Sequence, residues 1–91
     1  MEPIEQGSLV VVKGIRDQAM LRRAWAEEDG YVLIHDEAEY AKRINGESYF
    51  EPVPFRRADV AICPQKLAQR IKARNWVAPW SEVESELRAL A

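Results

Sequence analysis

Short apolar segments are separated by short polar segments along the chain, and this pattern predicts a protein built mainly from strands. Residues 8–13 are β-branched and apolar between two glycines, which is typical of a strand buried on both faces. Residues 31–35 carry side chains that alternate between two faces of a second strand. Residues 58–63 predict a last short strand, whereas the prolines within residues 49–55 favour an extended segment outside the centre of a sheet.

Residues 17–28 can be interpreted in two ways. Their Ala, Met, Leu, Arg and Glu residues have high helix propensity. However, residues 21–25 also alternate, and Asp29-Gly30 leads directly into the strand at residues 31–35. Because Asp-Gly suits a tight turn with positive φ, we predict a hairpin over residues 21–35 and keep the helix as the alternative.

Three helices are expected around these strands. Residues 37–44 follow the N-cap candidate Asp36 and stop at Asn45-Gly46. Pro64 suits the start of a helix over residues 65–74. A capping box at residues 81–84 starts the last helix, and residues between the two C-terminal helices break them apart.

These elements together predict one β-rich α+β domain over residues 1–91. Its β core would cover residues 8–63, and residues 64–91 would form a C-terminal helical extension. If residues 17–28 were helical, the alternative would be an α/β sandwich.

The order of these segments resembles a small barrel of the Src-homology-3-like type over residues 8–63. An opening strand at residues 9–13 is followed by a loop, the long hairpin, a stretch with Pro52-Val53-Pro54 and a closing strand at residues 59–62. Peptide-binding members of that superfamily carry an acidic-aromatic first loop and a later Trp-Trp or Trp-Lys pair. Neither pattern occurs here, so the resemblance implies a fold and does not imply binding of proline-rich ligands. The outline is also similar to that of short mobile-element and phage proteins.

Composition indicates in which compartment the protein is expected. The chain has 91 residues, a net charge of −2 and a single cysteine, Cys63, which fits a reducing compartment. No apolar run approaches the ~18 residues that span a bilayer, and the acidic N-terminus does not resemble a signal peptide. We therefore expect a cytoplasmic protein without a membrane partner.

Charge is distributed unevenly along the sequence. Residues 1–40 carry 4 basic and 9 acidic side chains, residues 41–75 carry 8 and 3, and residues 76–91 carry 1 and 3, so the three segments have charges of −5, +5 and −2. Segregated charge can mark an interaction face. The simpler expectation is that the opposite charges meet within the fold.

Few residues suggest chemistry. His35-Asp36 matches a dipeptide of metal phosphohydrolases, but the further ligands such enzymes need are missing. The carboxylates of residues 27–29 lie at the predicted hairpin tip, where solvent is the expected partner. Cys63 precedes a predicted helix, whose dipole would favour a thiolate, and a cysteine-based enzyme is therefore the third hypothesis. We predict no catalytic residues, no metal and no cofactor.

Two surfaces remain as candidates for recognition. Aromatic residues and arginine are enriched in the cores of protein interfaces, and basic residues with a nearby tryptophan can bind nucleic acid. The first hypothesis is a non-enzymatic protein-binding module, an adaptor or small inhibitor, whose partner is another protein or a second copy of the chain. The alternative is a nucleic-acid-associated protein. The predicted protein-binding residues are Tyr49, Phe50, Phe55, Trp76 and Trp80, and the predicted nucleic-acid-binding residues are Arg56, Arg57, Lys66, Arg70 and Arg74.

Overall fold

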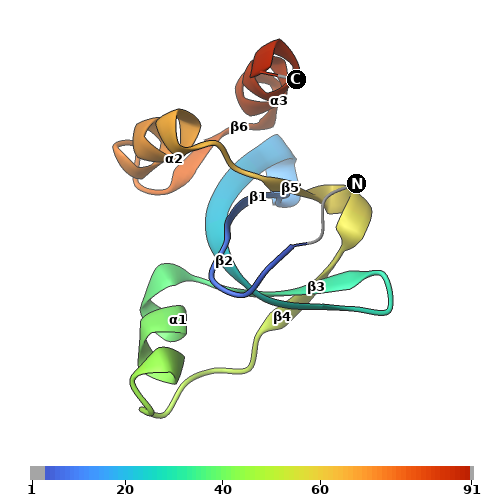
Figure 1. The fold of residues 1–91 in the computed structure, drawn as a ribbon. Coiled ribbons are helices and arrows are strands. Elements are labelled where there is room, and N and C mark those ends of the chain that lie inside the picture. Colours follow the sequence, from blue (N-terminus) through green and yellow to red (C-terminus); the bar gives the residue numbers. More distant parts are fainter. Residues whose placement is uncertain (1–3, 91) are drawn as a thin grey trace.

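The computed structural model describes residues 4–90. These residues form a six-stranded antiparallel sheet with three α-helices, which confirms the predicted β-rich α+β class (Figure 1). The strands are β1 (Leu9–Lys13), β2 (Gln18–Glu28), β3 (Tyr31–His35), β4 (Val53–Arg56), β5 (Val60–Ile62) and β6 (Val77–Pro79). The helices are α1 (Glu37–Ile44), α2 (Gln65–Lys72) and α3 (Trp80–Leu90), and two 3₁₀ turns are η1 (Ile15–Asp17) and η2 (Arg57–Asp59).

Strand β2 is the centre of the sheet. It pairs with β1 on one side, and on the other side with β3 along its C-terminal half and with β6 along residues 18–20. The predicted hairpin is confirmed, and the helical alternative for residues 17–28 is wrong. Asp29 and Gly30 have φ values of 50° and 81°, as a turn with two positive φ angles requires. Pairing along both edges of β2 outweighs its helix propensity.

The sheet buries apolar side chains on both faces. Within β1, Val10 and Val12 belong to an inner cluster with Val32 and Ile34, whereas Val11 faces the opposite way and packs with Leu21 under the C-terminal helices. All three valines of β1 are fully buried. The unbroken apolar run at residues 9–12 therefore reflects a strand covered on both faces, as predicted.

The structure agrees only in part with the small barrel that the sequence resembles, because the sheet does not close. The strand order is β4-β3-β2-β1-β5, and β4 and β5, at the two ends of this path, do not pair with each other within residues 4–90. The sheet is strongly curved but remains open (Figure 1). The arrangement shown is a small open antiparallel sheet with C-terminal helices.

The C-terminal part departs from the prediction in three places. Residues 58 and 59 belong to the 3₁₀ turn η2, so β5 is shorter than expected. Residues 77–79, expected only to separate two helices, form β6 and join the sheet, so the part expected to be purely helical contributes a strand. Helix α2 ends at Lys72, and α3 begins at Trp80, so Ser81 lies inside the helix and does not cap it.

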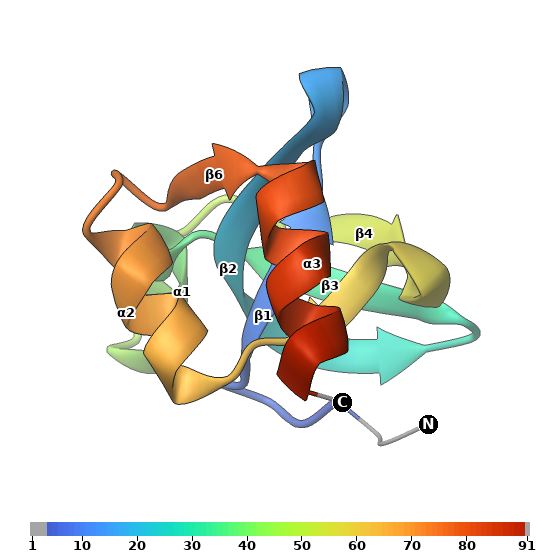
Figure 2. The same ribbon diagram turned by 90° about the horizontal axis from the view of Figure 1, so that it is seen from above.

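The three helices cover different parts of the sheet. Helices α2 and α3 lie on one side of the molecule, joined through β6, and α1 lies on the opposite side beside β3 (Figures 1 and 2). Helix α1 has the predicted bounds, and the Asp36 side chain accepts a hydrogen bond from the Glu39 amide as an N-cap. The turn between β1 and β2 projects away from the body of the protein (Figure 2).

Candidate functional site

The densest group of polar and aromatic contacts surrounds Arg43 on α1. We call it the Arg43 cluster, and its members are Trp25, His35, Tyr40, Arg43 and Tyr49. The Arg43 guanidinium carbon lies 3.6 Å from the Trp25 ring centroid and 4.7 Å from that of Tyr49. The His35 ring meets those of Trp25 and Tyr49 edge to face, with centroids 6.0 and 5.7 Å away. Stacked cations and T-shaped ring pairs are favourable contacts that fix side-chain orientation.

Four separate segments of the chain supply these side chains. Trp25 occupies a β-bulge of β2, where the register shifts between Ala24 and Ala26. Since Ala24 belongs to the inner cluster, the bulge leaves Trp25 on the outer face, beside α1. His35 ends β3, and Tyr40 and Arg43 stand one turn apart on α1.

The hydrogen bond between Arg43 and His35 determines the state of the imidazole. Arg43 Nη1 lies 3.1 Å from His35 Nε2. A guanidinium can only donate, so Nε2 accepts and the proton of the neutral ring is on Nδ1. Burial of the ring, which is 3% exposed, and then the charge of Arg43 lower the pKa of His35, although Asp36, Glu39 and Glu51 act in the opposite direction. His35 is therefore a neutral acceptor within the cluster at neutral pH.

A buried carboxylate next to the cluster holds the following loop. Glu39 is 8% exposed, and its Oε1 accepts a hydrogen bond of 3.2 Å from the backbone amide of Phe50. Its Oε2 lies 3.2 Å from the ammonium group of Lys42. Tyr49, the preceding residue, is fixed by His35 and Arg43. Residues 49 and 50 are thus held by both a side chain and the backbone.

Phe50 itself points into solvent. Its side chain is 79% exposed, and two other apolar side chains of the same region, Ile44 and Val53, are 51% and 56% exposed. Aromatic side chains such as that of Phe50 are enriched in the cores of protein interfaces. We call residues 44–53 the Phe50 loop.

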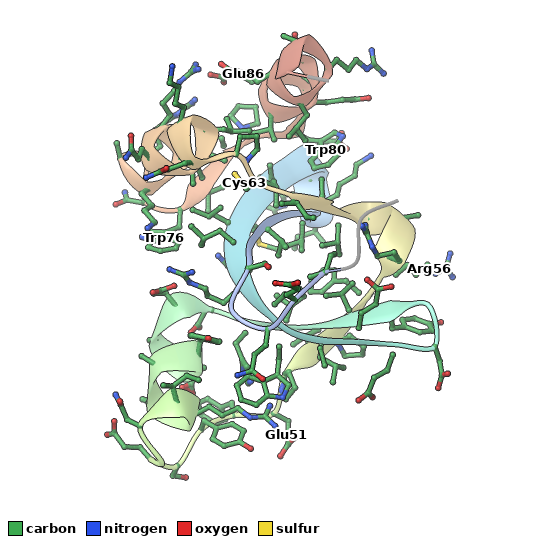
Figure 3. All side chains as sticks on the ribbon, in the orientation of Figure 1. Glu51, Arg56, Cys63, Trp76, Trp80 and Glu86 are labelled. Atoms are coloured by element: carbon green, nitrogen blue, oxygen red, sulfur yellow. The ribbon has the colours of Figure 1, made fainter. Side chains whose placement is uncertain are left out.

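The predicted aromatic surface is divided in the structure. Phe55 is partly buried against the inner cluster, whereas Trp76 and Trp80 pack against the cluster under α2 and α3. Figure 3 shows Trp76 and Trp80 on the side of α2 and α3, far from Glu51 in the Phe50 loop. Of the five predicted residues, only Tyr49 and Phe50 lie together, and of these two only Phe50 is exposed.

The predicted basic surface is also divided. Arg70 and Arg74 form ion pairs with Glu86 and Glu82 of α3, and Arg57 pairs with Glu27 at 3.2 Å. Arg56 is exposed near η2, away from α2, which carries Lys66 (Figure 3). Opposite charges from different segments of the sequence thus meet within the fold, as the simpler expectation stated.

Cys63 lies in a different environment from the one that would activate it. The thiol is buried in the cluster under α2 and α3, and burial raises its pKa to about 11. Its Sγ lies 3.6 Å from the carbonyl oxygen of Pro64. Desolvation therefore outweighs the effect of the following helix, and the thiol stays protonated at neutral pH.

The other chemical candidates are not assembled into a site. Residues 27–29 are exposed at the hairpin tip, and Glu27 binds Arg57 and the Ile4 amide. Among residues 4–90, no group of three or more His, Cys, Asp or Glu side chains is arranged to hold a metal ion. None of the helices in this part of the chain is long and apolar enough to cross a membrane.

Comparison of the chain with protein-family models, curated proteins and solved structures gives no match. The function therefore has to be inferred from the site alone.

Trp25, Arg43 and Glu39 were not recognised as site residues from the sequence. The spacing of Glu39 and Arg43 on a capped helix was available as a signal, because residues four apart share a face. Trp25 could not be assigned, since nothing in the sequence marks the bulge that places it next to α1. His35 is buried at the end of β3, and the sequence does not indicate that its partner is the cation Arg43.

Proposed function

We propose that this protein is a non-enzymatic protein-binding module whose contact surface is the Phe50 loop. The observation that carries the proposal is the 79% exposure of Phe50 on a fixed loop. The loop is held by the hydrogen bond that the Phe50 amide donates to the Glu39 carboxylate and by the packing of Tyr49 on Arg43. An exposed apolar side chain on a preorganised loop loses little conformational entropy on binding. Such residues often dominate the energy of an interface.

The arrangement of the rest of the molecule supports recognition through side chains. The order β4-β3-β2-β1-β5, with the short strand β5 beside β1, supports the fold-level resemblance to small Src-homology-3-like barrels, although the sheet is open. Small β domains of this kind use loops on a rigid scaffold for binding. The two residues carried over from the aromatic set, Tyr49 and Phe50, then have distinct roles: Tyr49 positions the loop and Phe50 makes the contact.

The test compares two exposed apolar side chains of equal prominence. Ile15, in the turn between β1 and β2, is 83% exposed and serves as the control for Phe50. We expect Phe50→Ala to weaken binding to a partner captured by the wild-type protein by about 30-fold or more, as at an interface hot spot, and Ile15→Ala to leave it unchanged. Binding would be measured by titration calorimetry, and self-association by analytical ultracentrifugation of the same variants.

The outcomes separate the alternatives. Loss of binding in Ile15→Ala with retention in Phe50→Ala would overturn the proposal. Equal loss in both variants would do so as well. If the partner is a second copy of the chain, the sedimentation profile of Phe50→Ala shifts to lower mass and that of Ile15→Ala does not.

A further inference from the structure

The Phe50 loop is held by two anchors, and both lie next to one buried imidazole. The ring of Tyr49 packs on the guanidinium of Arg43, with 4.7 Å between ring centroid and guanidinium carbon. The amide of Phe50 donates to Oε1 of Glu39. His35 touches the first anchor directly, because its ring meets that of Tyr49 edge to face and its Nε2 lies 3.1 Å from Arg43 Nη1. The protonation state of His35 therefore bears on how the loop is held.

The position of Arg43 depends on a neutral His35. A guanidinium has only donors, and an imidazolium has two donors and no acceptor. Once Nε2 carries a proton, the contact of 3.1 Å brings together two N–H groups and two positive charges. Within residues 4–90 Arg43 has no ion pair that would offset this repulsion. Protonation of His35 thus displaces Arg43 and removes the cation on which Tyr49 packs.

The second anchor is weakened by the same proton. Glu39 is 8% exposed, and its Oε2 accepts no hydrogen bond from residues 4–90, although the ammonium group of Lys42 lies 3.2 Å away. The charge of Glu39 favours the protonated form of His35. A charged imidazole therefore attracts the carboxylate that binds the Phe50 amide, and competes with that amide for it.

Charged and titratable groups face His35 from each element packed against it. They are Arg23 on β2, Asp36, Glu39 and Arg43 at α1, and Tyr49 and Glu51 of the Phe50 loop, which lies on the α1 side of the molecule (Figure 3). Arg23 is neutralised by Glu37 at 2.7 Å. The three nearby carboxylates favour the charged ring, but burial and then the charge of Arg43 outweigh them and lower the pKa of His35.

We propose that His35 is a pH switch for the Phe50 loop, which is ordered while the imidazole is neutral and released when it is protonated. The inference rests on the proposed function only for its effect on binding, since the loop can be observed without a partner. In the released state the ring is hydrated and its pKa returns toward 6.5. The ratio of ordered to released loop then falls by up to about tenfold per pH unit below that value. A partner that binds the ordered loop is lost in acid.

NMR relaxation of the full chain labelled with ¹⁵N, from pH 7.5 to pH 5.0, tests the switch. His35 is the only histidine in the sequence, so its ring resonances give the titration midpoint without ambiguity. We expect this midpoint below 6.5, and the backbone order parameter of Phe50 should fall from about 0.85 to below about 0.6 with the same midpoint. Leu21, whose amide binds the Trp76 carbonyl under the C-terminal helices, is the control and should stay ordered.

Three variants test the roles of the side chains. His35→Gln can still accept from Arg43 and cannot be protonated, so the order of the loop should not depend on pH. Arg43→Gln removes the charge that opposes protonation, and the midpoint of His35 should rise toward 6.5. Lys42→Gln removes the adjacent cation of the same helix, which pairs with Glu39, and should shift the midpoint much less. The dispersion of the spectra at pH 7.5 shows whether each variant is folded.

A ring that stays neutral down to pH 5.0 would overturn the proposal, and so would a Phe50 order parameter that does not follow the ring. If the histidine variant fails to fold, equal midpoints in the wild type and in Arg43→Gln would still overturn it.

Binding is tested separately. The affinity for a partner captured by the wild-type protein should fall at least tenfold from pH 7.5 to pH 5.0, and should not fall in His35→Gln. If acid releases the loop but Phe50→Ala binds the partner as the wild type does, the proposed function fails and the switch stands. If Phe50→Ala abolishes binding and the loop stays ordered in acid, the switch alone is rejected.

Discussion

Burial shifts the pKa values of His35 and Cys63 in opposite directions. The cationic form of the imidazole and the anionic form of the thiol are both disfavoured in an apolar environment, so the pKa of His35 is lowered and that of Cys63 is raised. For His35 a second cause acts in the same direction, because Arg43 donates to its ring nitrogen. Both residues are neutral in the folded protein at pH 7, and each gives a measurable consequence.

The free energy of unfolding should fall as the pH drops below about 6.5. Unfolded His35 takes up a proton near its ordinary pKa of 6.5, whereas folded His35 resists it, so the unfolded state is favoured as the pH falls from that value toward the lower folded pKa. The slope from this residue is at most about 1.4 kcal/mol per pH unit.

Urea denaturation of the wild type and of His35→Gln from pH 5 to pH 8 measures this effect. The glutamine variant cannot titrate there, and its side-chain oxygen can still accept from Arg43. The difference in unfolding free energy between the two proteins should therefore change with pH in favour of the wild type as the pH rises. A constant difference would show that burial and the charge of Arg43 do not lower the pKa of His35 in the folded protein.

Cys63 should react slowly with iodoacetamide. A pKa of about 11, against 9.0 for an unperturbed thiol, lowers the thiolate fraction at pH 7 about 100-fold, and burial restricts access further. Adduct formation followed by mass spectrometry, with the same protein in urea as the reference, measures the ratio of rates. Modification as fast in the folded protein as in urea would reinstate a reactive thiol.

At the scale of elements, the junction of β3 and α1 determines how the Arg43 cluster is held. Asp36 caps α1 through the Glu39 amide, and α1 then carries Glu39, Tyr40 and Arg43 to the bulge of β2 and to the Phe50 loop. The acidic first turn and basic last turn of α1 suit its macrodipole. An eight-residue helix is marginal by itself, so its cap matters for the cluster as well as for stability.

Replacing the cap residue Asp36 should therefore affect both the stability of the protein and the packing of the Arg43 cluster. We expect Asp36→Ala to lower the unfolding free energy by about 1 kcal/mol, and Asp36→Ser, which can still cap, to lower it by much less. Urea denaturation gives these values. Acrylamide quenching of Trp25 fluorescence, measured in variants that also carry Trp76→Phe and Trp80→Phe, reports on the packing of Arg43. If the alanine and serine variants were equally destabilised, the effect would come from the charge of Asp36 on its surroundings and not from the cap.

Local signals predicted the elements that depend on neighbours in the sequence. The Asp29-Gly30 turn, the Asp36 cap and the buried run of β1 were all recognised, because each has its cause within a few residues. Strand β6 was missed, since residues 77–79 include a proline and become a strand only by pairing with the distant β2. The same holds for the bulge at Trp25, which exists only relative to β3. The Arg43 cluster joins four segments, and its composition could not be read from any one of them.

For the molecule as a whole, the edges of the open sheet limit how it can meet a partner. The Arg57 amide donates to the Gly30 carbonyl at 2.9 Å, which continues the ladder between β3 and β4 by one step. The alternation of an antiparallel ladder then directs the nitrogen of Pro54 toward the outer edge of β4, where it has no hydrogen to donate.

Some backbone groups on the outer edges of β5 and β6 are also bound within the fold. In β5 the Val60 amide donates to the Arg57 carbonyl, and the Val60 carbonyl accepts from Arg57 Nη1. Next to β6, the Leu21 amide of β2 donates to the Trp76 carbonyl. The same alternation therefore turns the Val77 amide outward, where it donates to the Arg74 carbonyl. The nitrogen of Pro79 also faces outward, and it has no hydrogen to donate. Addition of a partner strand is thus disfavoured at Pro54, Val60, Val77 and Pro79, which agrees with the proposed contact through side chains of the Phe50 loop.

Pro54 is the position at which the resistance of the sheet edge to pairing with another strand can be tested. Pro54→Thr places an N–H on the outer edge of β4 without changing the pairing with β3, and threonine favours strands. We expect the variant to form dimers or larger species that increase with protein concentration in sedimentation experiments, relative to the wild type. Pro52→Thr, just before β4, is the matched control and should sediment as the wild type does. If both variants behave alike, the proline does not protect this edge. Combining Pro54→Thr with Phe50→Ala separates the two surfaces, because association through the strand edge persists without Phe50, whereas association through the Phe50 loop does not.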